Sequence, residues 1–283
     1  MTSKTSEYIL RFQSQDQLGI VAAISTALWR SQANIIHMDQ YSEDDGQFFM
    51  RLAFSLSDRS QLEELRRHIQ QVSEPFRGIW SIYDMSIRPR MGILVSKPAH
   101  CLKELLYLWE SGELAVDIPF VISNHADHEE YVRHHGIPYM YIPSSTEDRK
   151  EAEILSVIKD STDFLVLARY MQILSADFLK QYNQAIINIH HSFLPSFKGA
   201  NPYKQAHDAG VKIIGATAHY VTPVLDEGPI IAQEVTPVSH QDTVASLKQK
   251  GARLERQCLS QAVHAHVNQK ISIYQGRSIV FNS

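Results

Sequence analysis

The feature that most constrains the fold is a change of pattern near Arg88-Pro89-Arg90. Before this seam, residues 1–88 show short strand and helix patterns in the order β-α-β-β-α-β. The expected strands are 8–13, 35–42, 48–56 and 80–88, and the expected helices are 19–32 and 58–72. This order predicts a four-stranded sheet with two helices on one face, a ferredoxin-like α+β domain.

Residues 89–283 instead alternate strands with helices. The continuous apolar run 164–168 is typical of a strand buried on both faces of a parallel sheet. Strands are expected at 91–95, 119–123, 139–142, 164–168, 185–188, 215–220 and 230–235, and helices at 100–111, 145–159, after Ser175, and at 242–269. The pattern predicts a doubly wound, Rossmann-like α/β domain, in which ligands lie beyond the carboxyl ends of the strands.

Composition excludes several classes of function. A net charge of -4 lacks the basic field that nucleic acid or an anionic membrane requires. No apolar run approaches the ~18 residues of a membrane span, and the polar start of the chain is unlike a secretory signal. The two cysteines, Cys101 and Cys258, form neither a disulfide framework nor a zinc pattern. We therefore expect a cytoplasmic protein without a metal site.

Three polar residues stand out in the second region. Asn188 and His190 are two positions apart at the end of an expected strand, so their side chains point to the same face. An amide and an imidazole side by side can polarise a carbonyl and move a proton. Asp226 lies in a loop between two later strands, where a carboxylate can reach a neighbouring strand end. Taken singly, each residue could instead be an ordinary strand-end or turn residue.

Their order and long flanking sequences resemble the catalytic triad of the formyltransferase fold that uses 10-formyltetrahydrofolate. The resemblance covers about residues 91–274. It implies that Asn188 and His190 hold the formyl oxygen as negative charge develops, and that Asp226 relays protons or orients the nucleophile. The segment 164–174 resembles the one that lines the pterin pocket. The residues for which we accordingly expect substrate contacts are Arg169, Tyr170, Met171, Ile173, Leu174, Lys198, Asn201 and His219.

Some of these substrate contacts have an equally simple structural explanation. Met171, Ile173 and Leu174 could belong to an ordinary apolar core. Lys198 and Asn201 could be solvated loop residues, and His219 could be a packed histidine whose hydrogen bonds are satisfied.

The first region resembles the ACT-type regulatory domain through residues 16–21 and 34–36. The resemblance implies a small amino-acid effector bound near Asp16, Gly19, Ile20 and Asn34, and a homo-oligomer, because ACT domains commonly pair. Asp16 and Asn34 could instead serve as a helix cap and a turn residue. An ACT domain joined to this catalytic fold is the arrangement of the formyltetrahydrofolate deformylase family. The related transformylases typically have proline at the position of His191, so this residue also favours the deformylase family.

The turn 96–100 bears on the identity of the formyl acceptor. Ser96-Lys97-Pro98-Ala99-His100 contains no glycine, and Pro98 has no N–H group, so the turn is poorly suited to cradle a phosphate. We therefore expect water as the acceptor, with formate and tetrahydrofolate as products in one-carbon and purine metabolism, and no redox cofactor. Two alternatives remain: a formyltransferase with a non-phosphorylated amine acceptor, and a catalytically inactive regulator that binds folate or an amino acid.

Overall fold

The computed structural model describes residues 6–145, 147–196 and 201–282. These residues form two compact units. The first contains the described residues up to Arg88 together with Asn268–Ser272 and those from Ile279 onward. The second contains Pro89–Val267 and Ile273–Ser278. The described helices include none that is both long and apolar enough to cross a bilayer.

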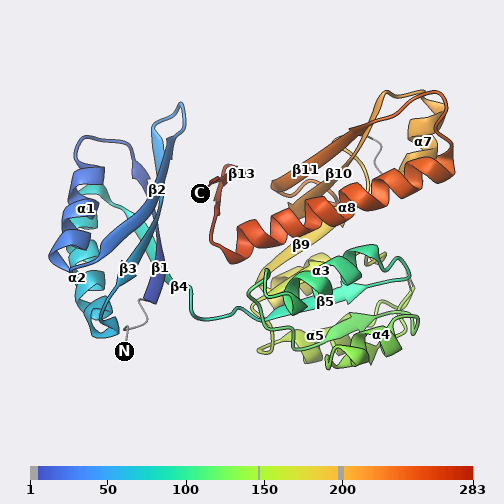
Figure 1. The fold of residues 1–283 in the computed structure, drawn as a ribbon, viewed down its shortest axis with the longest axis horizontal. Helices are drawn as coiled ribbons and strands as arrows, with labels where there is room; N and C mark the ends of the chain where they lie inside the picture. Colours follow the sequence, from blue (N-terminus) through green and yellow to red (C-terminus); the bar gives the residue numbers. More distant parts are fainter. Residues whose placement is uncertain (1–5, 146, 197–200, 283) are drawn as a thin grey trace. The chain divides into compact units, whose positions relative to one another are not determined.

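The first unit is built on an antiparallel four-stranded sheet with the order β2-β3-β1-β4. Its elements are β1 (Ser6–Gln15), α1 (Ile20–Arg30), β2 (Asn34–Ser42), β3 (Gln47–Leu56), α2 (Leu62–Ser73) and β4 (Ile79–Asp84), with short 3-10 turns at Arg59–Gln61 and Glu74–Phe76. Both helices lie on one face of this sheet (Figure 1). Helix α1 places Ile20, Ile24 and Leu28 in the core at helical spacing. Gly19 precedes it with φ 97°, a left-handed conformation that favours glycine.

The second unit holds a seven-stranded sheet with the order β11-β10-β9-β8-β5-β6-β7. Its strands are β5 (Met91–Val95), β6 (Val121–Ser123), β7 (Tyr139–Tyr141), β8 (Phe164–Leu167), β9 (Ala185–His190), β10 (Ile213–Tyr220) and β11 (Ile230–Pro237). Neighbouring strands are parallel throughout the part of the sheet with the order β9-β8-β5-β6-β7, whereas β10 and β11 are antiparallel to their neighbours. The strand order reverses between β5 and β8, which is where such sheets bind ligands.

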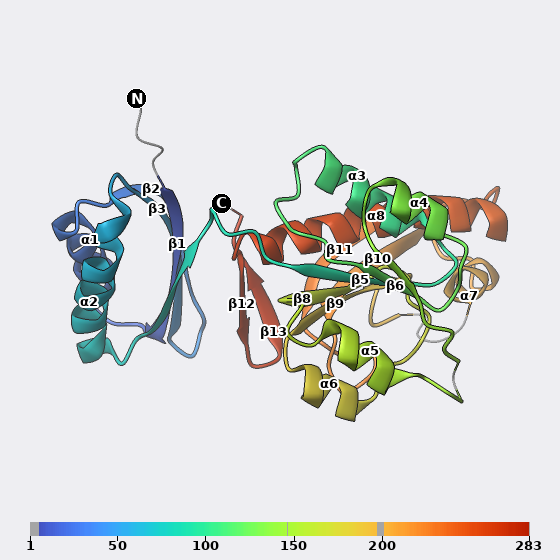
Figure 2. The same ribbon diagram turned by 90° about the horizontal axis from the view of Figure 1, so that it is seen from below.

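Helices cover both faces of this second sheet. They are α3 (His100–Glu110), α4 (Glu129–His134), α5 (Glu151–Ile158), α6 (Ala176–Tyr182), α7 (Pro202–Asp208) and α8 (Val244–Val267). Figure 2 shows α3, α4 and α8 on one face and α5 and α6 on the other. The central strands are therefore buried on both sides, as the apolar run 164–168 predicts.

The fold class predicted from the sequence is confirmed in both units. Among the described helices and strands, four have no counterpart in the prediction: α4, α7 and the two strands of a hairpin, β12 (Ile271–Tyr274) and β13 (Arg277–Val280). Each is short, so hydrophobic periodicity gives little signal. The helix expected from residue 145 begins instead at Glu151, because Lys150 before it adopts φ 53°, a left-handed conformation that interrupts a right-handed helix.

Candidate active site

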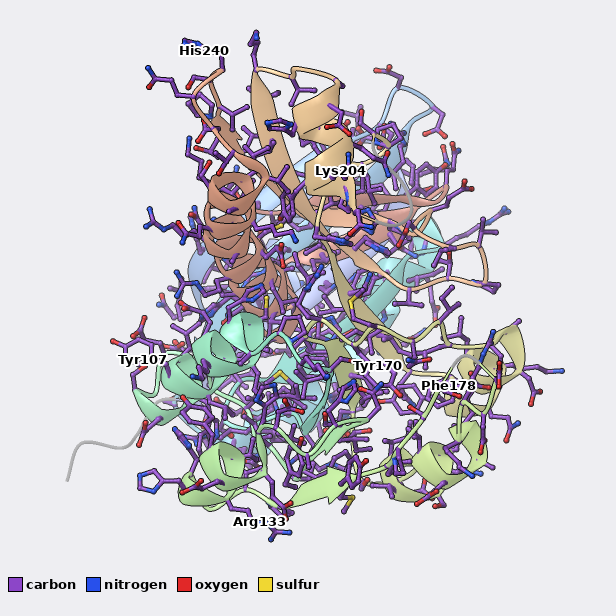
Figure 3. All side chains as sticks on the ribbon, turned by 90° about the vertical axis from the view of Figure 1, so that its right-hand side faces the viewer. Tyr107, Arg133, Tyr170, Phe178, Lys204 and His240 are labelled. Atoms are coloured by element: carbon purple, nitrogen blue, oxygen red, sulfur yellow. The ribbon has the colours of Figure 1, made fainter. Side chains whose placement is uncertain are left out.

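A cavity of about 980 Å³ opens in the second unit at the carboxyl ends of β8 and β9. Its size suits a substantial organic ligand. The loop between β10 and β11, helix α7 and one face of α8 supply the other walls. Figure 3 shows Tyr170, in the segment after β8, and Lys204, on α7, which line it from two different elements.

Asn188, His190 and Asp226 all line this cavity. The carboxylate oxygen Oδ2 of Asp226 lies 3.3 Å from Nδ1 of His190. Asp226 adopts φ 56°, so the loop holds a non-glycine residue in the left-handed region to present this carboxylate. The three residues that the sequence singles out are therefore neighbours in the structure, although Asp226 comes from a different part of the chain.

His219 joins this group through the pairing of β9 with β10. In that register His219 lies opposite Asn188. Its Nδ1 lies 2.9 Å from the Tyr220 carbonyl, which can only accept, so Nδ1 carries a proton. Its Nε2 lies 3.2 Å from Nδ2 of Asn188 and 3.6 Å from Oδ1 of Asp226. Neutral His219 accepts from the Asn188 amide, whereas protonated His219 forms an ion pair with Asp226.

The electrostatics of the group keep Asp226 charged. Burial by itself would raise the pKa of Asp226, but hydrogen bonds from His190 and His219 outweigh burial and hold this pKa below its usual range. The other ring nitrogen of His190, Nε2, is buried and has no hydrogen-bond partner among the described residues. A buried polar atom without a partner at a cavity wall is available to a ligand.

Residues 169–174 of the predicted pterin segment all line the cavity, and some of them also pack in the core. Tyr170 is buried, and its hydroxyl lies 3.1 Å from that of Ser144. Leu174 packs against the core cluster below the sheet. Met171 and Ile173 are each 54% exposed and line the cavity, so about half of each apolar side chain is left uncovered by the described residues. Met171, Ile173 and Leu174 therefore all reach the cavity wall, and their contact with a pterin stays a prediction.

A second polar cluster borders the same cavity around Glu255, which sequence reasoning missed. The Glu255 side chain is 2% exposed, and its Oε2 lies 3.3 Å from Nε of Arg169. The same oxygen is 2.7 Å from Nε2 of His100, and the Tyr203 hydroxyl donates to Oε1 at 2.5 Å. Burial opposes ionisation, but His100, Arg169 and Tyr203 together keep the pKa of Glu255 below its ordinary value.

The position of Glu255 does leave a trace in the sequence. It falls on the apolar face of α8, next to Leu254 and four residues before Leu259, both of which are buried. A charged residue on such a face needs a partner. Tyr203 reaches it because residue 251 is glycine: a Cβ at Gly251 would lie 1.9 Å from the Tyr203 hydroxyl.

The remaining predicted substrate contacts have separate outcomes. Asn201 is exposed, lines the cavity and precedes α7 with φ 56°. Lys198 lies outside the described residues. Arg169 lines the cavity as expected, but its side chain is 12% exposed and paired with Glu255.

The predicted effector residues lie at the start of α1 and on the neighbouring loops of the first unit. The Asp16 carboxylate accepts a hydrogen bond from the Ser42 hydroxyl at 2.8 Å. Asn34 is exposed at the start of β2. The Ile20 side chain is 2% exposed and packs in the core, so a ligand in the loop would contact Ile20 only through its backbone at the start of α1. Periodicity could have indicated this, since Ile20 opens the apolar face of α1.

His100, Cys101 and Glu255 bring three potential metal-ligand atoms within 4.8 Å of one another, a grouping that the sequence analysis did not predict. The charge and protonation of these side chains disfavour the binding of a metal cation. Arg169 already neutralises Glu255, and burial raises the pKa of the Cys101 thiol well above its ordinary value, so the thiol stays protonated. The group is better described as part of the Glu255 cluster.

Comparisons with known proteins agree with this architecture. Residues 89–263 match the family model described as Formyl transferase, and residues 8–74 match the ACT domain. The chain is 45% identical to a formyltetrahydrofolate deformylase of Synechocystis, over 94% of this chain and 95% of the relative. It is 44% identical to one of Bacillus subtilis, over 94% and 91%.

Solved structures give the same result. A formyltetrahydrofolate deformylase from Pseudomonas syringae superposes with a TM-score of 0.93 at 38% identity, over 98% of this chain and 95% of that one. Glycinamide ribonucleotide transformylase 1 from Symbiobacterium toebii superposes with a TM-score of 0.64 at 29% identity, over 71% of this chain and 97% of that one. The latter therefore matches a smaller share of the present chain.

Fold and site together define a formyltransferase-fold enzyme with an N-terminal ACT domain. Near full-length similarity narrows this class further. The chain belongs to the formyltetrahydrofolate deformylase family.

Proposed function

We propose that this protein hydrolyses 10-formyltetrahydrofolate to tetrahydrofolate and formate, an activity that serves one-carbon and purine metabolism. The observation that carries the proposal is the meeting of Asn188, His190 and Asp226 at one cavity, with Nε2 of His190 left without a partner. The names of the relatives support the same reaction.

In the proposed mechanism the formyl oxygen lies between the Asn188 amide and Nε2 of His190. Attack by water makes a tetrahedral intermediate whose oxygen carries negative charge. Asn188 donates a hydrogen bond to this oxygen, and cationic His190, paired with Asp226, offsets its charge. Collapse breaks the carbon–nitrogen bond, and the folate nitrogen takes up a proton. These steps need no metal and no redox cofactor.

The folate ring system fits the apolar side of the cavity. Met171 and Ile173 offer exposed apolar side chains there, and Leu225 and Val221 line the same space. Arg169, Asn201 and His219 supply polar groups at its edge. We expect contacts between these residues and the pterin, because a flat heterocycle buries best against apolar walls with a few polar groups that fix its orientation.

Water, rather than a phosphorylated amine, is the proposed acceptor. The Ser96 N–H already donates to the Arg169 carbonyl at 3.2 Å. The carbonyls of Ser96 and Lys97 each lie 3.0 Å from Nε2 of His128. The turn therefore presents carbonyl oxygens to a histidine and does not form the concave group of N–H donors that binds a phosphate. Pro98 adds no N–H.

Purified protein given 10-formyltetrahydrofolate alone should release formate. Absence of turnover unless an amine is added would refute hydrolysis.

The ACT domain is proposed to bind a small amino acid near Asp16, Gly19 and Asn34. The backbone at Gly19 leaves open space, since a Cβ there would meet nothing within 4 Å. Gly19→Trp would fill that space and should abolish any change in turnover caused by amino acids. A response that survives the substitution would place the effector elsewhere.

We also expect a homo-oligomer, because β2 is an edge strand that exposes Ile36 and Met38.

A further inference from the structure

His191 lies in the cavity beside the three proposed catalytic residues. Its ring centroid is 5.3 Å from that of His190 and 6.0 Å from that of Tyr203. The ring lines the cavity, and no described residue forms a hydrogen bond with either of its nitrogens. Packing on two sides therefore fixes the ring, while the described residues leave its polar atoms available to a ligand.

The surroundings of His191 also set its charge. Arg169, Glu255, His190 and Asp226 are the charged and titratable groups that act on it. Burial, followed by the positive charge of Arg169, lowers the pKa of His191 to about 4. At neutral pH the imidazole is uncharged and one nitrogen keeps a lone pair. A neutral imidazole in a cavity can accept a hydrogen bond from water.

Hydrolysis requires such an acceptor. The proposed roles of Asn188 and His190 commit both to the formyl oxygen, and Asp226 already faces two histidines. A water molecule attacks well only when another group orients its lone pair toward the carbonyl carbon. His191 directly follows His190, the last residue of β9, and has no competing protein partner among the described residues.

Resting on the proposed hydrolysis, we propose that His191 holds the attacking water and so selects water as the formyl acceptor. The new carbon–oxygen bond forms from the oxygen of this water, and the carbon–nitrogen bond breaks. One proton of the water is transferred to the folate nitrogen, and the other is released as the product ionises to formate. The Glu255 cluster stands behind His191 and fixes its position through Tyr203.

The test replaces the ring by one of similar shape that lacks nitrogens. His191→Phe keeps the aromatic contact with Tyr203 but cannot orient water. The matched control is His134→Phe, which changes an exposed histidine on α4 outside the cavity. Formate release is measured with 10-formyltetrahydrofolate, alone and with hydroxylamine as a competing nucleophile, and the hydroxamate is quantified against a reaction without enzyme.

His191→Phe should lower kcat for formate release by a factor on the order of 10 to 100, with little change in KM for the folate. Hydroxylamine should capture a larger share of the formyl group, because it depends less on an oriented water. The control should match the wild type in both measurements. A folded His191→Phe protein with wild-type kcat and partition would overturn the proposal.

His191→Ala provides a second measurement if the phenylalanine variant does not fold. Added imidazole should restore part of its lost kcat, an effect that a purely structural role would not give. Unchanged kcat in His191→Ala, or a low kcat that imidazole does not raise, would overturn the role of His191. A wild-type protein that releases no formate would instead refute the proposed function itself.

Discussion

Two carboxylates, the partly buried Asp226 and the buried Glu255, border the same cavity, and they differ in their partners. Asp226 comes from the loop between β10 and β11 and faces His190 and His219. Glu255 comes from α8 and faces Arg169, His100 and Tyr203. Both have a pKa below the ordinary value although burial opposes this. Similar charge states thus arise from two different environments.

The partners determine what each carboxylate can do. Histidine gains and loses a proton near neutral pH, whereas arginine stays charged. The pair of Asp226 with His190 can therefore respond when negative charge forms on the reacting oxygen and is lost again. The pair of Glu255 with Arg169 has a fixed charge and serves to hold the cavity wall. The comparison predicts that one carboxylate matters for turnover and the other chiefly for stability.

The largest effect is expected at Asp226. Asp226→Asn removes the charge that stabilises cationic His190 while keeping the shape of the side chain. Turnover should fall by a factor on the order of a hundred or more, with a thermal unfolding midpoint close to the wild type. His190→Ala and Asn188→Ala should each show a loss of similar size. Near wild-type turnover in a folded Asp226→Asn protein would remove Asp226 from the mechanism.

Glu255→Gln should mainly affect stability. It leaves the buried Arg169 without its counter-charge, and the free energy of unfolding should fall by about 3 kcal/mol. Denaturant titration measures this change. Arg169→Met combined with Glu255→Met should cost less than the sum of the two single changes, because each single change leaves an isolated buried charge and the double change leaves none. Additive losses would show that the two side chains do not act as a pair.

A smaller effect concerns the dependence of stability on pH. The pKa of His191 is about 4 in the folded protein, against an ordinary value of 6.5. The contribution of neutral His191 to the free energy of unfolding is fully present above pH 6.5 and is lost as the pH falls through 4, amounting to roughly 3 kcal/mol. His191→Phe should flatten the fall in unfolding free energy across this range. An unchanged slope would mean that His191 is not held in its neutral form.

No effect is expected from metal removal. His100, Cys101 and Glu255 lie close together, but Arg169 supplies the positive charge that Glu255 requires. Turnover after exhaustive dialysis against a chelator should equal that of untreated protein. Loss of activity that a divalent ion restores would mean that the second carboxylate is a metal ligand.

The sequence predicts the part of the site that lies close together along the chain. Asn188 and His190 share a face because strand side chains alternate, and this needs no knowledge of the fold. The contact of His219 with Asn188 depends on the register between β9 and β10, which no local pattern specifies. The long flanking resemblance compensates for this at Asp226, whose loop conformation is equally non-local.

Glu255 illustrates what sequence reasoning misses. Its partners come from three other elements, namely α3, α7 and the segment after β8. Only tertiary packing brings them together, and only the absence of a side chain at Gly251 lets Tyr203 approach. The side chain of Ile20 is the opposite case, because local helical periodicity alone predicts that it packs in the core.

The most direct test of the account follows the oxygen that enters the product. The enzyme is given 10-formyltetrahydrofolate in ¹⁸O-water, with glycinamide ribonucleotide present in excess, and the formate is examined by mass spectrometry. Hydrolysis predicts formate that carries one ¹⁸O atom, and no formylated ribonucleotide. Formyl carbon recovered in the ribonucleotide, with no labelled formate above the level without enzyme, would contradict the conclusion that water is the acceptor.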